Sequence, residues 1–146
     1  MSYKFLMPLA ILGGFLSIWI LSGYLLAKLS GWDRLSDEFR AGRKFDGSWA
    51  WFTSVQMRYR ITYSNVIHIG FDEYGLHLKV LFPFRIGHPR LFIPWNEIQI
   101  LALRKHFLGA SIQPLVLGNT AQIRFNFSSR KAERVFAQYC DRDSHV

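Results

Sequence analysis

The sequence predicts a mainly β protein with helices at both ends: an N-terminal transmembrane helix, then an antiparallel β-barrel of about seven strands that a C-terminal helix caps. Three observations support this fold class. A 23-residue segment near the N-terminus has no charged side chain. From residue 48 onward hydrophobic residues recur with the period of two that is typical of strands, and beyond residue 129 they recur with helical spacing.

The uncharged segment, residues 5–27, reads FLMPLAILGGFLSIWILSGYLLA. At about 1.5 Å per residue, a helix of this length measures roughly 34 Å, more than the ~30 Å hydrocarbon core of a bilayer. A cleaved signal peptide is the alternative, but its apolar part usually has about 7–15 residues and ends near an A-x-A site, which does not follow here. We therefore expect residues 5–27 to contact the lipid bilayer as a transmembrane helix.

Positive charge is distributed unequally about this segment. Lys4 is the only Lys or Arg before it, whereas five follow it closely: Lys28, Arg34, Arg40, Arg43 and Lys44. The cytoplasmic flanks of membrane helices carry the excess of Lys and Arg. The asymmetry predicts a single-pass protein with its C-terminal domain in the cytoplasm.

Small residues are spaced four apart within the span. Ala10 pairs in this way with Gly14, and Gly13 pairs with Ser17. Such spacing lets two helix backbones approach closely, which would suit a homodimer or a membrane-protein partner. Small residues are also common in membrane helices without such a role, and both interpretations stay open.

The next segment, residues 30–47, places Trp32, Leu35 and Phe39 at helical spacing among charged residues. This predicts a short amphipathic helix whose aromatic side lies either on lipid or on the following domain. The predicted organisation is a transmembrane helix with its flank at 1–29, a juxtamembrane helix and linker at 30–47, a β domain at 48–140 and a tail at 141–146.

One hairpin can be predicted with its register. Strands 66–71 and 75–80 flank the turn Asp72-Glu73-Tyr74-Gly75, in which glycine suits the backbone. The expected pairs are Phe71 with Leu76, Gly70 with His77, Ile69 with Leu78, His68 with Lys79 and Ile67 with Val80. This register gathers the hydrophobic residues on one face. We expect His68 and His77, on the other face, to be solvated.

The remaining strands follow from shorter patterns. In 48–61 the odd positions, including Trp49, Trp51, Thr53, Val55 and Met57, are expected on one face. Residues 91–93 form a strand that Pro94 ends, residues 98–103 form another, and 115–117 pairs with 121–127 across Gly118-Asn119-Thr120. The last helix presents Ala132, Val135, Phe136 and Tyr139 on one side, with Val135, Phe136 and Tyr139 closing one end of the barrel.

The motifs Gly75-Leu76, Ile93-Pro94-Trp95 and the following Ile98 resemble those of bacterial pleckstrin-homology-like (PH-like) domains. The stretch FRIGHPRLFIPWNEI, downstream of a single span and of Ser-Gly-Trp at 30–32, is similar to a group of small single-span bacterial membrane proteins with no assigned function. The resemblance implies a PH-like barrel and a location in the bacterial inner membrane. It implies no activity.

The best candidate binding surface is the segment PFRIGHPR. Arg85, His88 and Arg90 would present cationic groups beside Trp95, where a phosphate, a carboxylate or anionic head groups could dock. The alternative is structural: the glycine and prolines set a turn, the arginines are solvated and Trp95 packs on the barrel.

The sequence has no motif typical of a metal site, a cofactor site or a catalytic nucleophile. The five histidines have no metal-binding spacing, the single cysteine, Cys140, has no indicated base, and no glycine-rich phosphate loop occurs, so we expect no metal and no cofactor. The net charge of +8 could attract nucleic acid, but the aromatic residues fall at core positions rather than among basic ones, so none is expected.

The sequence therefore predicts a non-catalytic, membrane-anchored module that binds a protein or an anionic surface, as an adaptor or as an accessory subunit of a membrane complex. The alternative is an enzyme that acts on a lipid or phosphate substrate at Arg85, His88 and Arg90.

Overall fold

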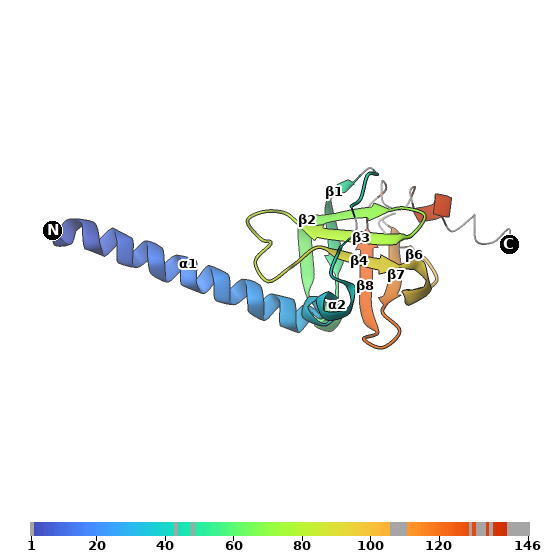
Figure 1. Ribbon diagram of the computed structural model, residues 1–146, viewed down its shortest axis with the longest axis horizontal. Coiled ribbons are helices and arrows are strands. Elements are labelled where there is room, and N and C mark those ends of the chain that lie inside the picture. Colours follow the sequence, from blue (N-terminus) through green and yellow to red (C-terminus); the bar gives the residue numbers. More distant parts are fainter. Residues whose placement is uncertain are drawn as a thin grey trace.

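A long helix projects from a small β domain in the computed structural model (Figure 1). The structure describes residues 2–42, 44–47, 49–105, 111–128, 130, 134 and 136–139. Helix α1 (Tyr3–Ser30) ends at Gly31, whose positive φ of 89° turns the chain sharply into α2 (Trp32–Phe39). Within the described residues, α1 alone is long and apolar enough to cross a membrane, and its most apolar 18-residue window is wholly unburied.

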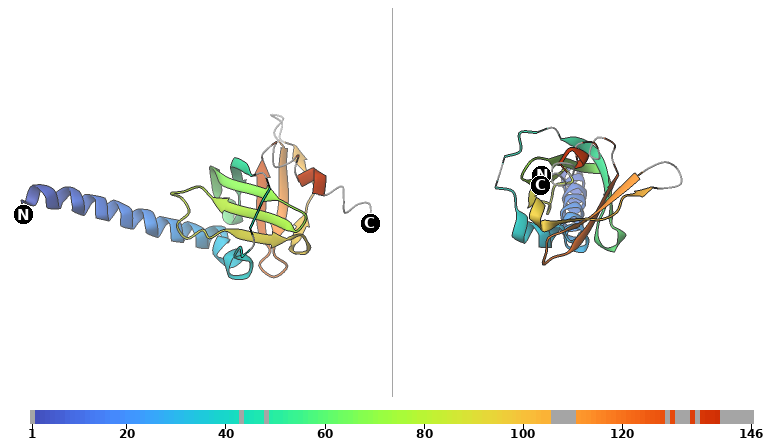
Figure 2. Two further views of the ribbon diagram at one scale, coloured as in Figure 1. Left: turned by 45° about the horizontal axis from the view of Figure 1, so that its top comes forward. Right: turned by 90° about the vertical axis from the view of Figure 1, so that its right-hand side faces the viewer.

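Seven antiparallel strands follow one another around a nearly closed barrel, in the order β4-β3-β2-β1-β8-β7-β5 (Figure 2). An eighth, β6, pairs only with β7. The strands are β1 (Ala50–Gln56), β2 (Thr62–Phe71), β3 (Gly75–Val80), β4 (Leu91–Pro94), β5 (Ile98–Ile100), β6 (Arg104–Lys105), β7 (Ser111–Leu117) and β8 (Ile123–Ser128). Single helical turns η1 (Arg58–Arg60) and η2 (Trp95–Glu97) join β1 to β2 and β4 to β5.

The β2–β3 hairpin has the predicted register at all five pairs, from Ile67 with Val80 to Phe71 with Leu76. Its turn is held by the Asp72 carboxylate, which accepts hydrogen bonds from the backbone N–H groups of Tyr74 and Gly75, each at 2.9 Å. The β7–β8 hairpin across residues 118–120 is also confirmed.

Gly75 allows the next strand to approach, and this gives a first testable prediction. A Cβ atom at this position would overlap the carbonyl oxygen of Ile93 in β4. We expect Gly75→Ala to lower the free energy of unfolding by about 1–3 kcal/mol, because two backbones would have to separate. Denaturant unfolding in detergent measures this. Gly42→Ala, where a Cβ meets nothing within 4 Å, is the control, and equal effects of the two substitutions would contradict the prediction.

Hydrophobic side chains from every long strand fill the barrel. Val55, Ile67, Ile69, Leu76, Leu78, Ile93, Leu115, Phe125 and Phe127 are each at most 1% exposed. One end is closed by the short C-terminal helix: the Phe136 ring lies 5.3 Å from that of Phe71 and 5.9 Å from that of Phe127. This confirms the predicted cap, although Ala132 and Val135 lie outside the described residues.

The outer face of the β2–β3 hairpin differs from the prediction. His68 and His77 were expected to be solvated, but each is only 1% exposed. The segment before β1 folds back over this face and places the Phe45 ring 4.6 Å from His77. Trp51, in β1 itself, places its ring 4.4 Å from His68. Gly70 makes room for Phe45, because a Cβ there would meet the ring at 2.5 Å.

The first strand also corrects an expectation. Trp51 does not share the inward face of Thr53, Val55 and Met57, since it is 51% exposed whereas those three are buried. The pairing of β1 with β2 shifts between Ala50 and Thr53, where Phe52 has a positive φ of 54°. This irregularity interrupts the alternation, as a β-bulge does.

The structure decides between the two interpretations of residues 30–47. Trp32 and Leu35 of α2 are completely buried against the domain. The hydrophobic side of the amphipathic helix therefore lies on protein, and α2 fastens the end of α1 to the barrel.

Candidate functional site at the junction of helix and barrel

The loop between β3 and β4, residues 81–90, projects from the barrel along α1 (Figure 1). Two glycines bring the loop and the helix together: a Cβ at Gly23 would lie 2.9 Å from the Ile86 carbonyl oxygen, and one at Gly87 would lie 3.1 Å from Tyr24 Cα. Further along the helix, the rings of Trp19 and Phe84 are 5.2 Å apart. The last third of α1 is thus packed on the domain.

This packing shortens the free part of α1. The helix begins at Tyr3 and already contacts the loop at Trp19. Residues 3–18 measure only about 24 Å at the helical rise of roughly 1.5 Å per residue. The contact between Trp19 and Phe84 therefore lies well inside the apolar segment rather than after it.

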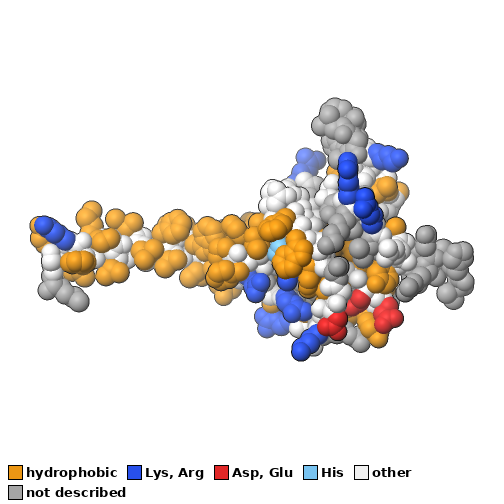
Figure 3. Space-filling model, turned by 90° about the horizontal axis from the view of Figure 1, so that it is seen from above, with side chains coloured by type: hydrophobic (Ala, Val, Ile, Leu, Met, Phe, Trp, Pro, Cys, Tyr) orange, Lys and Arg blue, Asp and Glu red, His pale blue; other side chains and the backbone are white. Residues whose placement is uncertain are grey.

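The tip of the loop is hydrophobic and unburied. Phe82 is 75% exposed and Phe84 is 44% exposed, and both belong to the β3–β4 loop that packs beside α1. Figure 3 shows that the exposed surface of α1 is almost entirely hydrophobic, with Lys and Arg side chains gathered on the domain beside the junction. Hydrophobic and cationic groups thus meet at one end of the barrel.

Two cavities flank the junction. On one side an apolar cavity of about 440 Å³ lies between α1 and the start of β2, with Trp19, Leu26, Val66 and Phe84 among its lining residues. On the other side a cavity of about 320 Å³ is lined by Lys28, Arg40, Arg85 and Asp33, among others. The second cavity has the net positive charge that anionic groups favour.

A buried chain of polar groups ties the loop to the end of α1. The Tyr63 hydroxyl lies 2.8 Å from Ser30 Oγ and 2.8 Å from His88 Nε2. His88 Nδ1 lies 2.8 Å from the Ile86 carbonyl oxygen. Because a carbonyl only accepts, Nδ1 of His88 carries the proton in its contact with Ile86.

Burial determines the protonation states of Tyr63 and His88 in this series of hydrogen bonds. His88 is 1% exposed, and desolvation lowers its pKa, partly offset by its hydrogen bond to Ile86. Desolvation raises the pKa of Tyr63 to about 12, against the lowering effect of its hydrogen bond with Ser30. Both groups are therefore neutral at pH 7, and they hold the loop as a rigid part of the domain.

The structure brings together three of the four predicted binding residues. Arg85 donates from Nε to the Val80 carbonyl oxygen at 3.2 Å, Arg90 is exposed, and His88 lies between them in the same loop. Trp95 lies elsewhere: its indole N–H donates to the Asp72 carbonyl oxygen at 2.9 Å and its ring stacks on Phe71, at the opposite end of β3. Trp95 is thus separate from this surface.

The small residues of the span lie on the exposed part of α1. Ala10, Gly13, Gly14 and Ser17 are all exposed, and a Cβ at either glycine would meet nothing within 4 Å. Ser17 Oγ donates to the Gly13 carbonyl oxygen at 2.8 Å. This surface remains available for contact with another helix.

Several residues of the site were missed from the sequence. Ser30 and Tyr63 reach His88 from distant positions, and no motif connects them. The exposure of Phe82 could have been predicted, because it precedes Pro83 in a loop, outside the alternating pattern of the strands. Among the described residues, no group of three or more His, Cys, Asp or Glu side chains could hold a metal ion.

The fold and this junction define a class of protein: a small antiparallel barrel attached to a helix that is able to cross a membrane. No family model, no curated protein and no solved structure matches the chain.

Proposed function

We propose that the protein is a single-pass protein of the bacterial inner membrane, whose PH-like barrel binds the anionic cytoplasmic surface of the bilayer without catalysing a reaction. It serves as an adaptor or as an accessory subunit of a membrane complex. The observation that carries the proposal is the early contact between α1 and the loop. The free residues 3–18 span about 24 Å, less than the ~30 Å hydrocarbon core, so the tip of the loop must enter the bilayer.

The side chains of the loop also suit insertion of its tip into the bilayer. Phe82 and Phe84 are exposed, the Phe84 ring contacts Trp19 of the span, and burying aromatic side chains in hydrocarbon is favourable. The cations at the same end, Lys28, Arg40 and Arg85, would then meet the phosphate groups of the inner leaflet. The seven-strand barrel with its C-terminal capping helix is compatible with the PH-like assignment.

The alternative of an enzyme at the same loop has less support. His88 is the only general base among the candidate residues, yet it is buried and both ring nitrogens are hydrogen-bonded within the protein. A general base must reach the proton that it removes. The buried chain from Ser30 to His88 is explained by the attachment of the loop to the helix.

Cysteine accessibility tests the proposed depth. The full chain, with Cys140→Ser and a single new cysteine at Phe82→Cys, is placed in lipid nanodiscs and treated with a membrane-impermeant maleimide. We expect labelling at least tenfold slower than for Glu73→Cys in the same background, because Glu73 is exposed in the β2–β3 turn at the other end of β3.

Denatured samples of both variants should label at equal rates, which controls for intrinsic reactivity. Fast labelling of the Phe82→Cys variant in nanodiscs would place the loop in water and overturn the proposal. The same labelling is repeated in nanodiscs in which phosphatidylglycerol replaces phosphatidylcholine. Slower labelling of the Phe82→Cys variant in the anionic nanodiscs would support binding to an anionic surface.

A further inference from the structure

Five arginines from four separate parts of the chain line one cleft. They are Arg34 of α2, Arg58 and Arg60 of η1, Arg104 of β6 and Arg124 of β8. The cleft has a volume of about 650 Å³, within the ~300–1,000 Å³ of small-molecule sites. Among the described residues, it shares no lining residue with the cavities at the junction.

Among the described residues, no carboxylate balances the charge of this cleft. None of the described residues that line it is an Asp or Glu. Among the residues that the structure describes, none of the five arginines forms an ion pair, and the nearest polar partner of Arg58 is the Tyr59 hydroxyl at 2.6 Å. Guanidinium groups stay protonated at any physiological pH, so the residues that line the cleft carry five positive charges.

The walls of the cleft are suited to hold an anion. Gln56, Gln122 and Asn126 add amide groups to the lining. Tyr59, Arg60 and Gln122 have positive φ angles of 57°, 59° and 48°, conformations that cost energy in residues other than glycine and that concentrate at ligand sites. The connection η1, which carries two of the arginines, and the turn before β8 thus have unusual backbone conformations beside the cleft.

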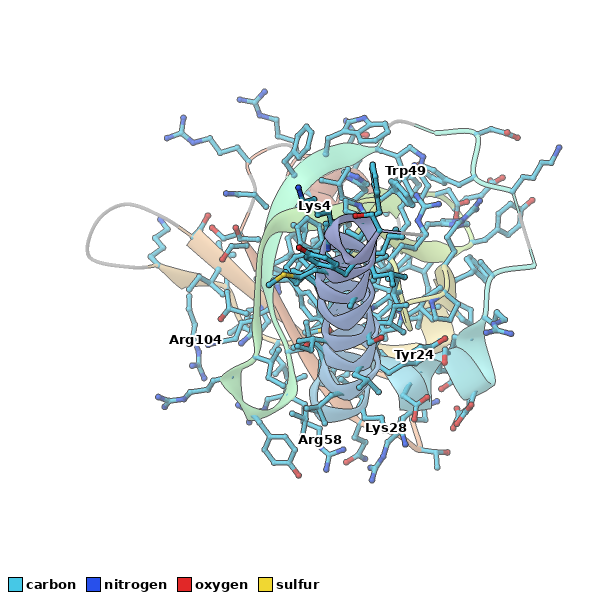
Figure 4. The ribbon with its side chains drawn as sticks, turned by 90° about the vertical axis from the view of Figure 1, so that its left-hand side faces the viewer. Lys4, Tyr24, Lys28, Trp49, Arg58 and Arg104 are labelled. Atoms are coloured by element: carbon cyan, nitrogen blue, oxygen red, sulfur yellow. The ribbon has the colours of Figure 1, made fainter. Side chains whose placement is uncertain are left out.

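We propose that this cleft binds a ligand that carries two or more phosphate groups close together. Arginine recognises phosphate with two parallel hydrogen bonds, and five guanidinium groups exceed the charge of a single phosphate. Figure 4, which looks along α1 from its N-terminal end, shows Arg58 and Lys28 on the same lower side of the helix, with Arg104 further to the left. The ligand is a free oligophosphate or a lipid head group; only the second source rests on the function proposed above.

Inorganic tripolyphosphate is the probe for the free source. Its affinity for the full chain in zwitterionic nanodiscs is measured by calorimetry at fixed salt. We expect Arg58→Gln together with Arg124→Gln to weaken binding at least tenfold. Lys44→Gln together with Arg130→Gln removes the same charge at exposed positions outside the cleft and is expected to change the affinity less than twofold. Unchanged circular dichroism shows that both variants are folded.

Cardiolipin, which carries two phosphates, is the probe for the lipid source. Native mass spectrometry counts the lipids that the full chain retains from nanodiscs of cardiolipin and phosphatidylcholine. If the cleft selects a lipid, the wild type and the Lys44/Arg130 variant retain cardiolipin and the Arg58/Arg124 variant does not. Phosphatidylglycerol at equal total charge should be retained less, because each molecule has one phosphate.

The proposal is overturned if neither probe binds, or if the two double variants lose binding equally, which would indicate attraction by net charge alone. These results are independent of the maleimide experiment at Phe82. A loop that stays in water would leave tripolyphosphate binding intact, whereas an inactive cleft would leave the loop protected by lipid.

Discussion

Replacing Trp32 with alanine is expected to lower the free energy of unfolding by about 3–5 kcal/mol, the usual cost of deleting a fully buried aromatic side chain. Trp32 has no exposed surface. Its indole N–H donates to the Pro89 carbonyl oxygen at 2.9 Å, and its ring lies 5.3 Å from that of His88. One side chain therefore joins α2 to the loop that packs on α1.

Denaturant unfolding of the detergent-solubilised protein measures this loss. Trp32→Phe keeps most of the packing but leaves the Pro89 carbonyl group without its donor, so about 1–3 kcal/mol is expected. Trp51→Ala, at a half-exposed position, is the matched control and should cost less. If Trp32→Ala and Trp51→Ala have similar effects, the junction is not the stabilising contact that its burial indicates.

The same contact explains how the loop is held against α1 and the domain. Gly23 and Gly87 allow the close approach, while Trp32 and His88 fix the loop from the domain side. A loss of this attachment would free the loop to lie on the bilayer at variable depth. In the maleimide experiment, Trp32→Ala is therefore expected to raise the labelling of the Phe82→Cys variant even where the barrel remains folded.

Local patterns were enough to predict the hairpins and the capping helix. In β2 and β3 a slip of one residue would turn Ile67, Ile69 and Leu78 outward, so the hydrophobic pattern and the turn at Asp72 permit one register. Phe136 could be placed at a barrel end because its helix carries a single hydrophobic side. Such predictions need only neighbours in the sequence.

Contacts between distant segments could not be predicted. His68 and His77 alternate with hydrophobic residues as solvated side chains do, and their burial depends on aromatic residues before and at the start of β1. The five-arginine cleft likewise requires α2, η1, β6 and β8 to meet, and only Arg58 and Arg60 are close in sequence. The fold creates both features.

Hydropathy also could not divide α1 between its two environments. Residues 5–27 are uniformly apolar, yet from Trp19 onward one side of the helix packs on the barrel. Apolar side chains are favourable both in a protein interior and in lipid, so composition cannot distinguish these two environments. The role of Gly23, which is to let the Ile86 carbonyl group approach the helix, becomes clear only with the loop in place.

The stability of the domain is expected to fall as the pH is lowered from 7 to 5, because two buried histidines resist protonation. Desolvation lowers the pKa of His68, with further lowering from Lys79 and Arg85, and desolvation also lowers the pKa of His88. His68 Nδ1 accepts the backbone N–H of Phe52 at 3.3 Å, which requires this nitrogen to be unprotonated. Both histidines are therefore neutral in the folded protein.

The sign of the effect follows from proton uptake. In the unfolded chain a histidine has a pKa of about 6.5, so below that pH the unfolded state binds protons that the folded state does not. The stability contributed by each histidine is fully present above about pH 6.5. It declines as the pH falls toward the lower folded value, by up to about 1.4 kcal/mol per pH unit for each group.

Thermal unfolding across this pH range, together with NMR titration of the histidine ring signals in the full chain, measures both sides of this linkage. The ring signals of His68 and His88 should titrate below pH 6.5, and His88→Asn should reduce the dependence of stability on pH by about half. Titration of either native histidine at or above 6.5 would contradict the assigned hydrogen bonds. If it is His88 that titrates so high, Tyr63 would be stabilising a charged ring, and acid would tighten the junction between the loop and α1 rather than loosen it.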